Sequence, residues 1–229
     1  MSIIRTAPAL ADQVYEALVD DICSGKLAAG IHLKQEQLAD QLGVSRQPVQ
    51  QAMALLKADG LVEDVGKRGL RVSPLDLGEM RHHYEIRALL DGFAARSTSL
   101  RLSQDPSLRE AFEQQVTSIL DAGKSAVSEG DVSAMVKHDQ AFHQLFYDMS
   151  GNPLVVKSAD PHCRYLRRVM GDVLRHAEPP REVWQQHEEI ANATLAGEAE
   201  TAQRLMEEHA NGAAQLLTDN FVHKDAGAS

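Results

Sequence analysis

The chain has 229 residues, of which 43% are hydrophobic and 24% are charged, and its formal net charge is −10. This composition is ordinary for a globular protein, and no apolar run approaches the roughly 18 residues that would suggest a membrane span. The first residues lack a charged region followed by an apolar core, so we expect no signal peptide. Cys23 and Cys163 form no CxxC pair, which is typical of a reduced, cytoplasmic protein.

The acidic charge is concentrated in the second part of the chain. Residues 1–74 hold eight Lys or Arg and nine Asp or Glu, whereas the remaining residues hold 15 and 24. A nearly neutral segment can still present a local basic surface to phosphates. The overall acidity therefore does not exclude a nucleic-acid-binding segment at the N-terminus.

The N-terminal segment begins with a helical pattern. Apolar residues recur every four positions between residues 9 and 23, which predicts a helix. A short extended piece is expected at 31–33, followed by a brief helix over 35–42. Gly43 is expected to cap this second helix at its C-terminus.

A further helix is expected to begin after Ser45, its cap, and to run to about residue 59, with Pro48 in the first turn. Residues 61–73 then predict two short strands around a glycine-bounded, basic turn. This order of elements is that of a winged helix-turn-helix, and we assign it to residues 1–74.

Seven polar or basic residues are candidates for contact with DNA. Those at the start of the second helix of the turn would meet phosphates with free backbone amides and read base edges with Arg and Gln, while basic residues of the wing could reach a neighbouring groove. The candidates are Ser45, Arg46, Gln47, Gln50, Lys67, Arg68 and Arg71. The alternative is a small helical interaction module whose charges are only solvated, and the basic hairpin favours DNA binding over it.

After Pro74 the sequence predicts helices only. They are separated by well-marked stops and are expected at 76–101, 106–128, 131–149, 153–175, 181–196 and 198–221. The predicted fold class is therefore mainly α, with an N-terminal winged helix-turn-helix followed by an all-helical bundle of about six helices at residues 75–229.

Four polar residues occupy positions where the bundle should have its core. Asp139 and His143 fall within the apolar stripe of the helix 131–149, and His187 and His209 fall within the stripes of two later helices. A buried carboxylate needs a cationic partner or a metal. One core histidine is usually only hydrogen-bonded, but three with an aspartate favour a site for Zn²⁺ or another divalent metal such as Ni, Mn or Fe.

The N-terminal pattern resembles a known family. "GVSRQPVQQAMALLKADGLV" followed by "GKRGLRV" is similar to the DNA-binding domain of GntR-family bacterial transcription regulators. In that family the second helix usually begins with a Ser-Arg-x-x-Val-Arg run whose two arginines contact the operator. Arg46 matches the first arginine and Gln50 replaces the second, so the resemblance implies fewer ionic contacts with phosphates.

The resemblance extends to the second domain. "DQAFHQLFYDMSGNP" is similar to the signature of the FCD effector domain in the FadR-like subfamily. It implies that Asp139, His143, His187 and His209 are metal ligands, and that the bundle dimerises and holds a small effector, commonly a carboxylate metabolite, beside the metal.

The helix 76–101 has two faces that both look suited to burial. One face is apolar and consists of Ile86, Leu89, Leu90, Phe93 and Leu100. Another face is partly polar and consists of Met80, Tyr84, Arg87, Asp91 and Thr98. "YEIRALLDG" resembles the E-x-R run of the subfamily, which assigns Arg87 to the effector carboxylate. The alternative is an Arg87–Asp91 salt bridge at i,i+4.

Tyr84, on the same face as Arg87, is a further effector-binding candidate. Arg164 is another, although Asp160-Pro161 is expected to disturb its helix.

The sequence thus predicts a dimeric, ligand-responsive transcription regulator that binds a short near-palindrome of double-stranded DNA. A rival is a metal-dependent hydrolase, because His138-Asp139 superficially resembles the HD pair of phosphohydrolases. Against it, His138 points about 100° away from Asp139, and a DNA-binding head would be unexplained. A third alternative is a metal that only stabilises the bundle.

Overall fold

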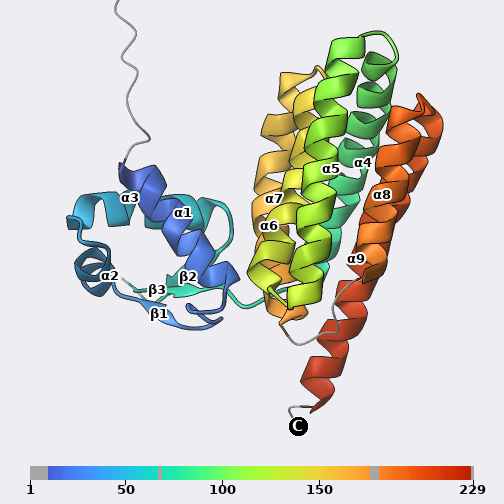
Figure 1. The fold of residues 1–229 in the computed structure, drawn as a ribbon. Coiled ribbons are helices and arrows are strands. Elements are labelled where there is room, and N and C mark those ends of the chain that lie inside the picture. The colour runs from blue at the N-terminus through green and yellow to red at the C-terminus, as the bar shows by residue number, and fades with distance from the viewer. Residues whose placement is uncertain (1–9, 67–68, 176–180, 228–229) are drawn as a thin grey trace, which may run out of the picture. The chain divides into compact units, whose positions relative to one another are not determined.

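The computed structural model describes residues 10–66, 69–175 and 181–227. The chain divides into two compact units, residues 1–75 and 76–229 (Figure 1). Of the candidate DNA-binding residues, Lys67 and Arg68 lie outside the described residues.

Among the described residues, the first unit contains three helices and a small antiparallel sheet. Its elements are α1 (Leu10–Cys23), β1 (His32–Leu33), α2 (Gln35–Leu42), α3 (Arg46–Ala58), β2 (Val62–Val65) and β3 (Gly69–Val72). The strand order is β1-β3-β2, and the β2–β3 hairpin pairs Val62 with Val72 and Val65 with Gly69. The predicted winged helix-turn-helix architecture is present.

The turn between α2 and α3 has the expected glycine geometry. Gly43 adopts a left-handed conformation with φ of 66°, which a residue with a Cβ rarely adopts. Ser45 occupies the N-cap position of α3 with an extended backbone, but its side chain makes no capping hydrogen bond, so that part of the prediction is wrong. Val49, Met53 and Leu56 of α3 are buried in the core of the unit, which fixes the helix against α1.

The second unit is a bundle of elongated helices (Figure 1). They are α4 (Leu77–Leu102), α5 (Pro106–Glu129), α6 (Val132–Met149), α7 (Pro153–Leu174), α8 (Arg181–Leu195) and α9 (Ala199–Gly227). The starts follow the sequence signals, since Asp105 and Asn152 cap α5 and α7 with their side chains and a proline follows each cap. The mainly α fold class is confirmed, and α9 extends beyond the predicted end at residue 221.

Aromatic side chains fill the centre of the bundle. Phe142 and Phe146 of α6 pack on one another and Phe146 packs on Phe112 of α5, with ring centroids 5.0 and 5.2 Å apart. Gly123 of α5 lets α8 approach closely, because a Cβ there would lie 1.9 Å from the Trp184 ring. The close contact positions α8, and with it His187, against the core.

Helix α7 runs unbroken through Pro161, so the expected disturbance at Asp160-Pro161 is wrong. Pro161 cannot donate a hydrogen bond to the carbonyl of Lys157. Both residues lie on the exposed side of α7, where water can satisfy that carbonyl. Arg164, one turn later, is therefore on a regular helix.

The sequence predicts that both faces of α4 are covered, but only one of them is buried within the described residues of the single chain. The partly polar face, including Tyr84, Arg87 and Asp91, is buried within the chain. The apolar face is open in the single chain except at Leu90, which is partly buried. Its exposed members are Ile86, Leu89, Phe93 and Leu100.

Near the end of the buried face of α9, Leu217 is 3% exposed and its neighbour Leu216 is 41% exposed. Within the described residues, no helix is long and apolar enough to cross a membrane.

Candidate functional site

One aspartate and three histidines converge inside the bundle. Asp139 and His143 come from adjacent turns of α6, His187 comes from α8 and His209 from α9, and all four are buried. One ligand atom from each lies within 4.8 Å of the others. The structure thus brings together the four residues that the sequence predicts as metal ligands.

The converging atoms can be identified. Nε2 of His187 lies 3.1 Å from Nε2 of His209 and 3.5 Å from Oδ1 of Asp139. Nε2 of His143 lies 3.9 Å from the same Asp139 oxygen. Ligand atoms held at roughly 2.1 Å from one ion lie about 3 to 4 Å apart, so these spacings suit a single small cation.

Neighbouring polar groups orient two of the imidazoles. Nδ1 of His143 lies 3.0 Å from Oδ2 of Asp91, and Nδ1 of His209 lies 2.9 Å from Oε1 of Gln186. In metal sites a ligating histidine usually donates its other N–H to a carboxylate or carbonyl oxygen, which fixes the tautomer. Asp91 and Gln186 have this position here and leave both Nε2 atoms facing the cluster.

Burial keeps His187 and His209 in the form that binds metal. It lowers the pKa of His187 and of His209 well below the ordinary value, and the nearby His143 and Arg87 lower both further. Neutral imidazole is the ligating form. For Asp91, burial opposes ionisation, but His143 and Arg87 outweigh it and lower the pKa to about 2.

A buried imidazole nitrogen that lacks a hydrogen bond shows whether the residues of the cluster suit a metal ion. Nε2 of His143 is fully buried and has no hydrogen-bond partner among the described residues. It faces the Asp139 carboxylate and the two other imidazoles, which are ligand types that bind divalent first-row metals. A divalent ion would satisfy this nitrogen, so the residues present fit such an ion.

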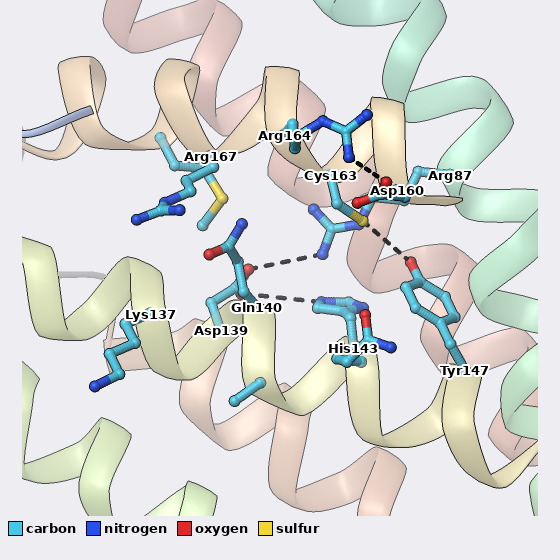
Figure 2. A pocket seen from close by; sticks show the side chains of 13 residues that line it. Arg87, Lys137, Asp139, Gln140, His143, Tyr147, Asp160, Cys163, Arg164 and Arg167 are labelled. Atoms are coloured by element: carbon cyan, nitrogen blue, oxygen red, sulfur yellow. Dashed lines mark hydrogen bonds and ion pairs between the residues drawn. The ribbon is translucent and has the colours of Figure 1, made fainter. Parts of the chain in front are cut away.

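A cavity of about 320 Å³ lies against this cluster, between α6 and α7 (Figure 2). Asp139 and His143 line it together with four cationic and one further acidic side chain. These are Arg87, Lys137, Arg164, Arg167 and Asp160. The excess of positive charge, to which a metal would add, favours an anionic ligand.

Arg87 joins the cavity to the cluster. Its guanidinium lies 3.2 Å from Asp91 and 3.6 Å from Asp139, and the side chain is almost fully buried. The Arg87–Asp91 salt bridge that the sequence offers as an alternative therefore exists, and Arg87 also borders the cavity. The ion pair positions Arg87 and does not exclude contact with a ligand.

The other two effector-binding candidates, Arg164 and Tyr84, line different cavities. Arg164 lines the cation-rich cavity and pairs with Asp160, the residue one turn before it (Figure 2). Tyr84 does not line that cavity but borders a separate, smaller one, which Arg87 also lines.

Several residues that line the cavity are not among those predicted from the sequence. Lys137, Gln140 and Gln144 of α6 and Cys163 and Arg167 of α7 line it. Asp139 and Gln140 are neighbours, and Arg164 and Arg167 are three apart, so spacing from the predicted residues could have suggested Gln140 and Arg167. The part of Asp91 in orienting His143 depends on a contact across 52 positions of sequence, which no local pattern reveals.

The predicted DNA-contacting residues at the start of α3 are all solvent-exposed. They are Ser45, Arg46, Gln47 and Gln50. Arg46 makes an exposed ion pair with Glu36 of α2. Such a surface pair contributes little free energy, so a phosphate or base can displace the glutamate. Arg71 lies in β3 and pairs with Glu63 of the facing strand at 2.6 Å.

A winged helix-turn-helix unit joined to a helical unit with a four-ligand cluster defines a class of DNA-binding regulators with a sensor domain. Comparison with known proteins gives the family. The FCD domain matches residues 82–212, and the pattern of bacterial regulatory proteins of the gntR family matches residues 10–72. The chain belongs to the GntR family of DNA-binding transcription regulators and carries an FCD domain.

Relatives from two bacteria support this assignment. The HTH-type transcriptional repressor RspR of Escherichia coli is 25% identical over 199 residues, which cover 86% of this chain and 84% of the relative. The HTH-type transcriptional regulator BphR of Paraburkholderia xenovorans is 26% identical over 209 residues, which cover 90% and 84%. The family and these relatives are transcription regulators, which contradicts the hydrolase alternative.

Solved structures share the fold. E. coli McbR/YncC superposes with a TM-score of 0.81 at 19% identity over 94% of this chain and 100% of its own. A GntR regulator from a Rhodococcus species gives a TM-score of 0.75 at 20% identity, covering 93% and 99%.

Proposed function

We propose that this regulator binds a short near-palindromic operator as a homodimer in the cytoplasm and responds to a small carboxylate held beside a divalent metal. Zn²⁺ is the first choice of metal, with Ni, Mn and Fe as alternatives. Asp139, His143, His187 and His209 would hold the ion. The ion would supply positive charge and an open position for a carboxylate oxygen.

The observation that carries the proposal is the position of Arg87. It lies within 3.6 Å of Asp139, one of the four clustered residues, and lines the cation-rich cavity. A carboxylate in this cavity could therefore contact Arg87 together with an ion held by the four clustered residues. Arg164 and Arg167 add further positive charge from the wall that α7 contributes to the cavity.

The proposed response is a shift between conformations. A ligand that binds one arrangement of the dimer better than another changes the affinity of the paired DNA-binding units for the two half-sites. Lys67, Arg68 and Arg71 of the wing would contact the DNA together with the start of α3, as the resemblance in sequence implies.

Titration of the full-length protein against fluorescently labelled DNA from its own promoter region tests the proposal. The metal-loaded protein should form a sequence-selective, salt-sensitive complex whose affinity changes severalfold with a carboxylate such as acetate or succinate. Absence of any selective complex would contradict it. If the complex forms but no carboxylate changes its affinity while a chelator lowers the melting temperature, the metal only stabilises the bundle.

The exposed apolar stripe of α4 is the surface that we assign to the dimer. Leu89→Glu is expected to weaken dimerisation at least tenfold, because it places a charge in an apolar interface. Sedimentation of the full-length protein over a concentration series would measure this. Leu154→Glu is the matched control, because Leu154 is 64% exposed and Leu89 66%, and Leu154 lies on another helix, α7. Equal sedimentation of the two variants would contradict the assignment.

Gln50→Arg is expected to tighten operator binding. The substitution restores a cation at an exposed position of α3, where the family usually has an arginine. One additional phosphate contact should steepen the slope of log affinity against log salt by about 0.9. Gel-shift titrations at several salt concentrations measure both quantities, and an unchanged affinity and slope would count against placing Gln50 at the DNA backbone.

A further inference from the structure

A second cavity borders the cation-rich one, and its character is opposite. Arg87, Asp139 and Met170 line both cavities. The remaining walls of the second cavity are mostly apolar and come from α7, α8 and α9. They include Leu174, Val183, Ala210, Ala213 and Leu217. Its volume is about 40 Å³, which gives room for roughly three water-sized groups.

Tyr84 contributes an unsatisfied donor to the second cavity, next to Arg87. Its side chain is 1% exposed, and its hydroxyl has no hydrogen-bond partner among the described residues. The Arg87 guanidinium carbon lies 5.8 Å from the centre of the Tyr84 ring. Burial raises the pKa of this phenol, so the hydroxyl keeps its proton and can donate. A ligand oxygen near Arg87 would satisfy it.

The two cavities therefore suit the two ends of one molecule. The first offers cations and, with a metal bound, an open coordination position, whereas the second would impose a large desolvation cost on any charge placed in it. A small diacid could use the first cavity only. A molecule with an apolar end would gain additional free energy by burying that end among the aliphatic side chains of the second.

We infer that the effector is an amphipathic carboxylate. Its carboxylate binds at Arg87, which lines both cavities, and accepts a hydrogen bond from Tyr84 of the second cavity, and its apolar group of about three or four carbons occupies the second cavity. This inference rests on the proposed function, because it names the chemical class of the effector for the same site. Arg87, which lines both cavities, is the point at which the head of the ligand would be held.

A chain-length series tests the inference. Calorimetric titration of the full-length, Zn²⁺-loaded protein with acetate, propanoate, butanoate, pentanoate and hexanoate should show affinity rising about two- to fourfold per methylene and then levelling off. Succinate and adipate should bind more weakly than butanoate and hexanoate, because their second carboxylate would be buried among apolar side chains. An affinity that does not change with chain length, or tighter binding of the diacids, would overturn the inference.

Two variants separate the head of the ligand from its apolar group. Ala213→Met fills the second cavity and should abolish the dependence on chain length. Ala214→Met is the matched control, because Ala214 is the next residue of α9, is also half-buried and lines neither cavity, and it should retain that dependence. Tyr84→Phe should instead weaken every acid of the series by about fivefold to tenfold.

Failure of the inference can be distinguished from failure of the proposed function. If the acids bind, require Zn²⁺ and alter operator affinity, but show no dependence on chain length, only the amphipathic class is wrong. If none of the acids binds and operator affinity does not respond to them, the inference and the proposed sensing function are both wrong.

Discussion

Removal of the divalent ion by a chelator is expected to lower the melting temperature of the helical unit by roughly 8–16 °C. An ion present at about 1,000 times its dissociation constant stabilises the folded state by about 4 kcal/mol, and each kcal/mol corresponds to roughly 2–4 °C for a unit of this size. The effect is large because Asp139 and the three histidines are buried and lose their hydration. Some of their polar atoms gain no hydrogen bond from the described residues in return.

Substitution of a ligand is expected to abolish this stabilisation. His143→Ala removes one ligand and should reduce bound metal, measured by elemental analysis, from one equivalent to near zero. Asp139→Asn serves as a second variant of almost unchanged shape. His138→Ala is the matched control, because His138 precedes Asp139 on α6 and is not among the four clustered residues. Equal metal content and an equal effect of chelator in His143→Ala and His138→Ala would contradict the proposed site.

Arg46→Ala is expected to weaken operator binding by about 5- to 150-fold. The guanidinium is exposed at the first residue of α3 and makes an exposed ion pair with Glu36. Loss of a base contact costs about 1–3 kcal/mol, and loss of a phosphate contact would in addition lower the salt slope by about one. Fluorescence anisotropy at several salt concentrations distinguishes the two roles.

Two further variants control for charge and for the ion pair. Lys57→Ala removes an equal charge from the last turn of α3, where Lys57 pairs with Asp64, and should leave operator affinity within about twofold. Glu36→Ala releases Arg46 and removes a negative charge, so binding should be equal or tighter. If Lys57→Ala weakens binding as much as Arg46→Ala, the first turn of α3 has no special role.

The helices and their order could be predicted from the amino-acid sequence, because periodicity, caps and breakers act over a few residues. The cap of α7 at Asn152 and the left-handed Gly43 are such local signals. The sequence also placed Asp139 and His143 on one face of α6, because residues four apart in a helix lie on the same side. The matching positions of His187 and His209 were recognisable for the same reason.

The way in which distant residues meet follows from the tertiary structure. The orientation of His143 by Asp91, the entry of Arg167 into the cavity wall, and the sharing of Arg87 by a polar and an apolar cavity all depend on the packing of separate helices. The tertiary structure also left Leu89 exposed and buried the partly polar face of α4. The amphipathic period of a helix shows that two faces differ, but neighbouring helices decide which face is covered.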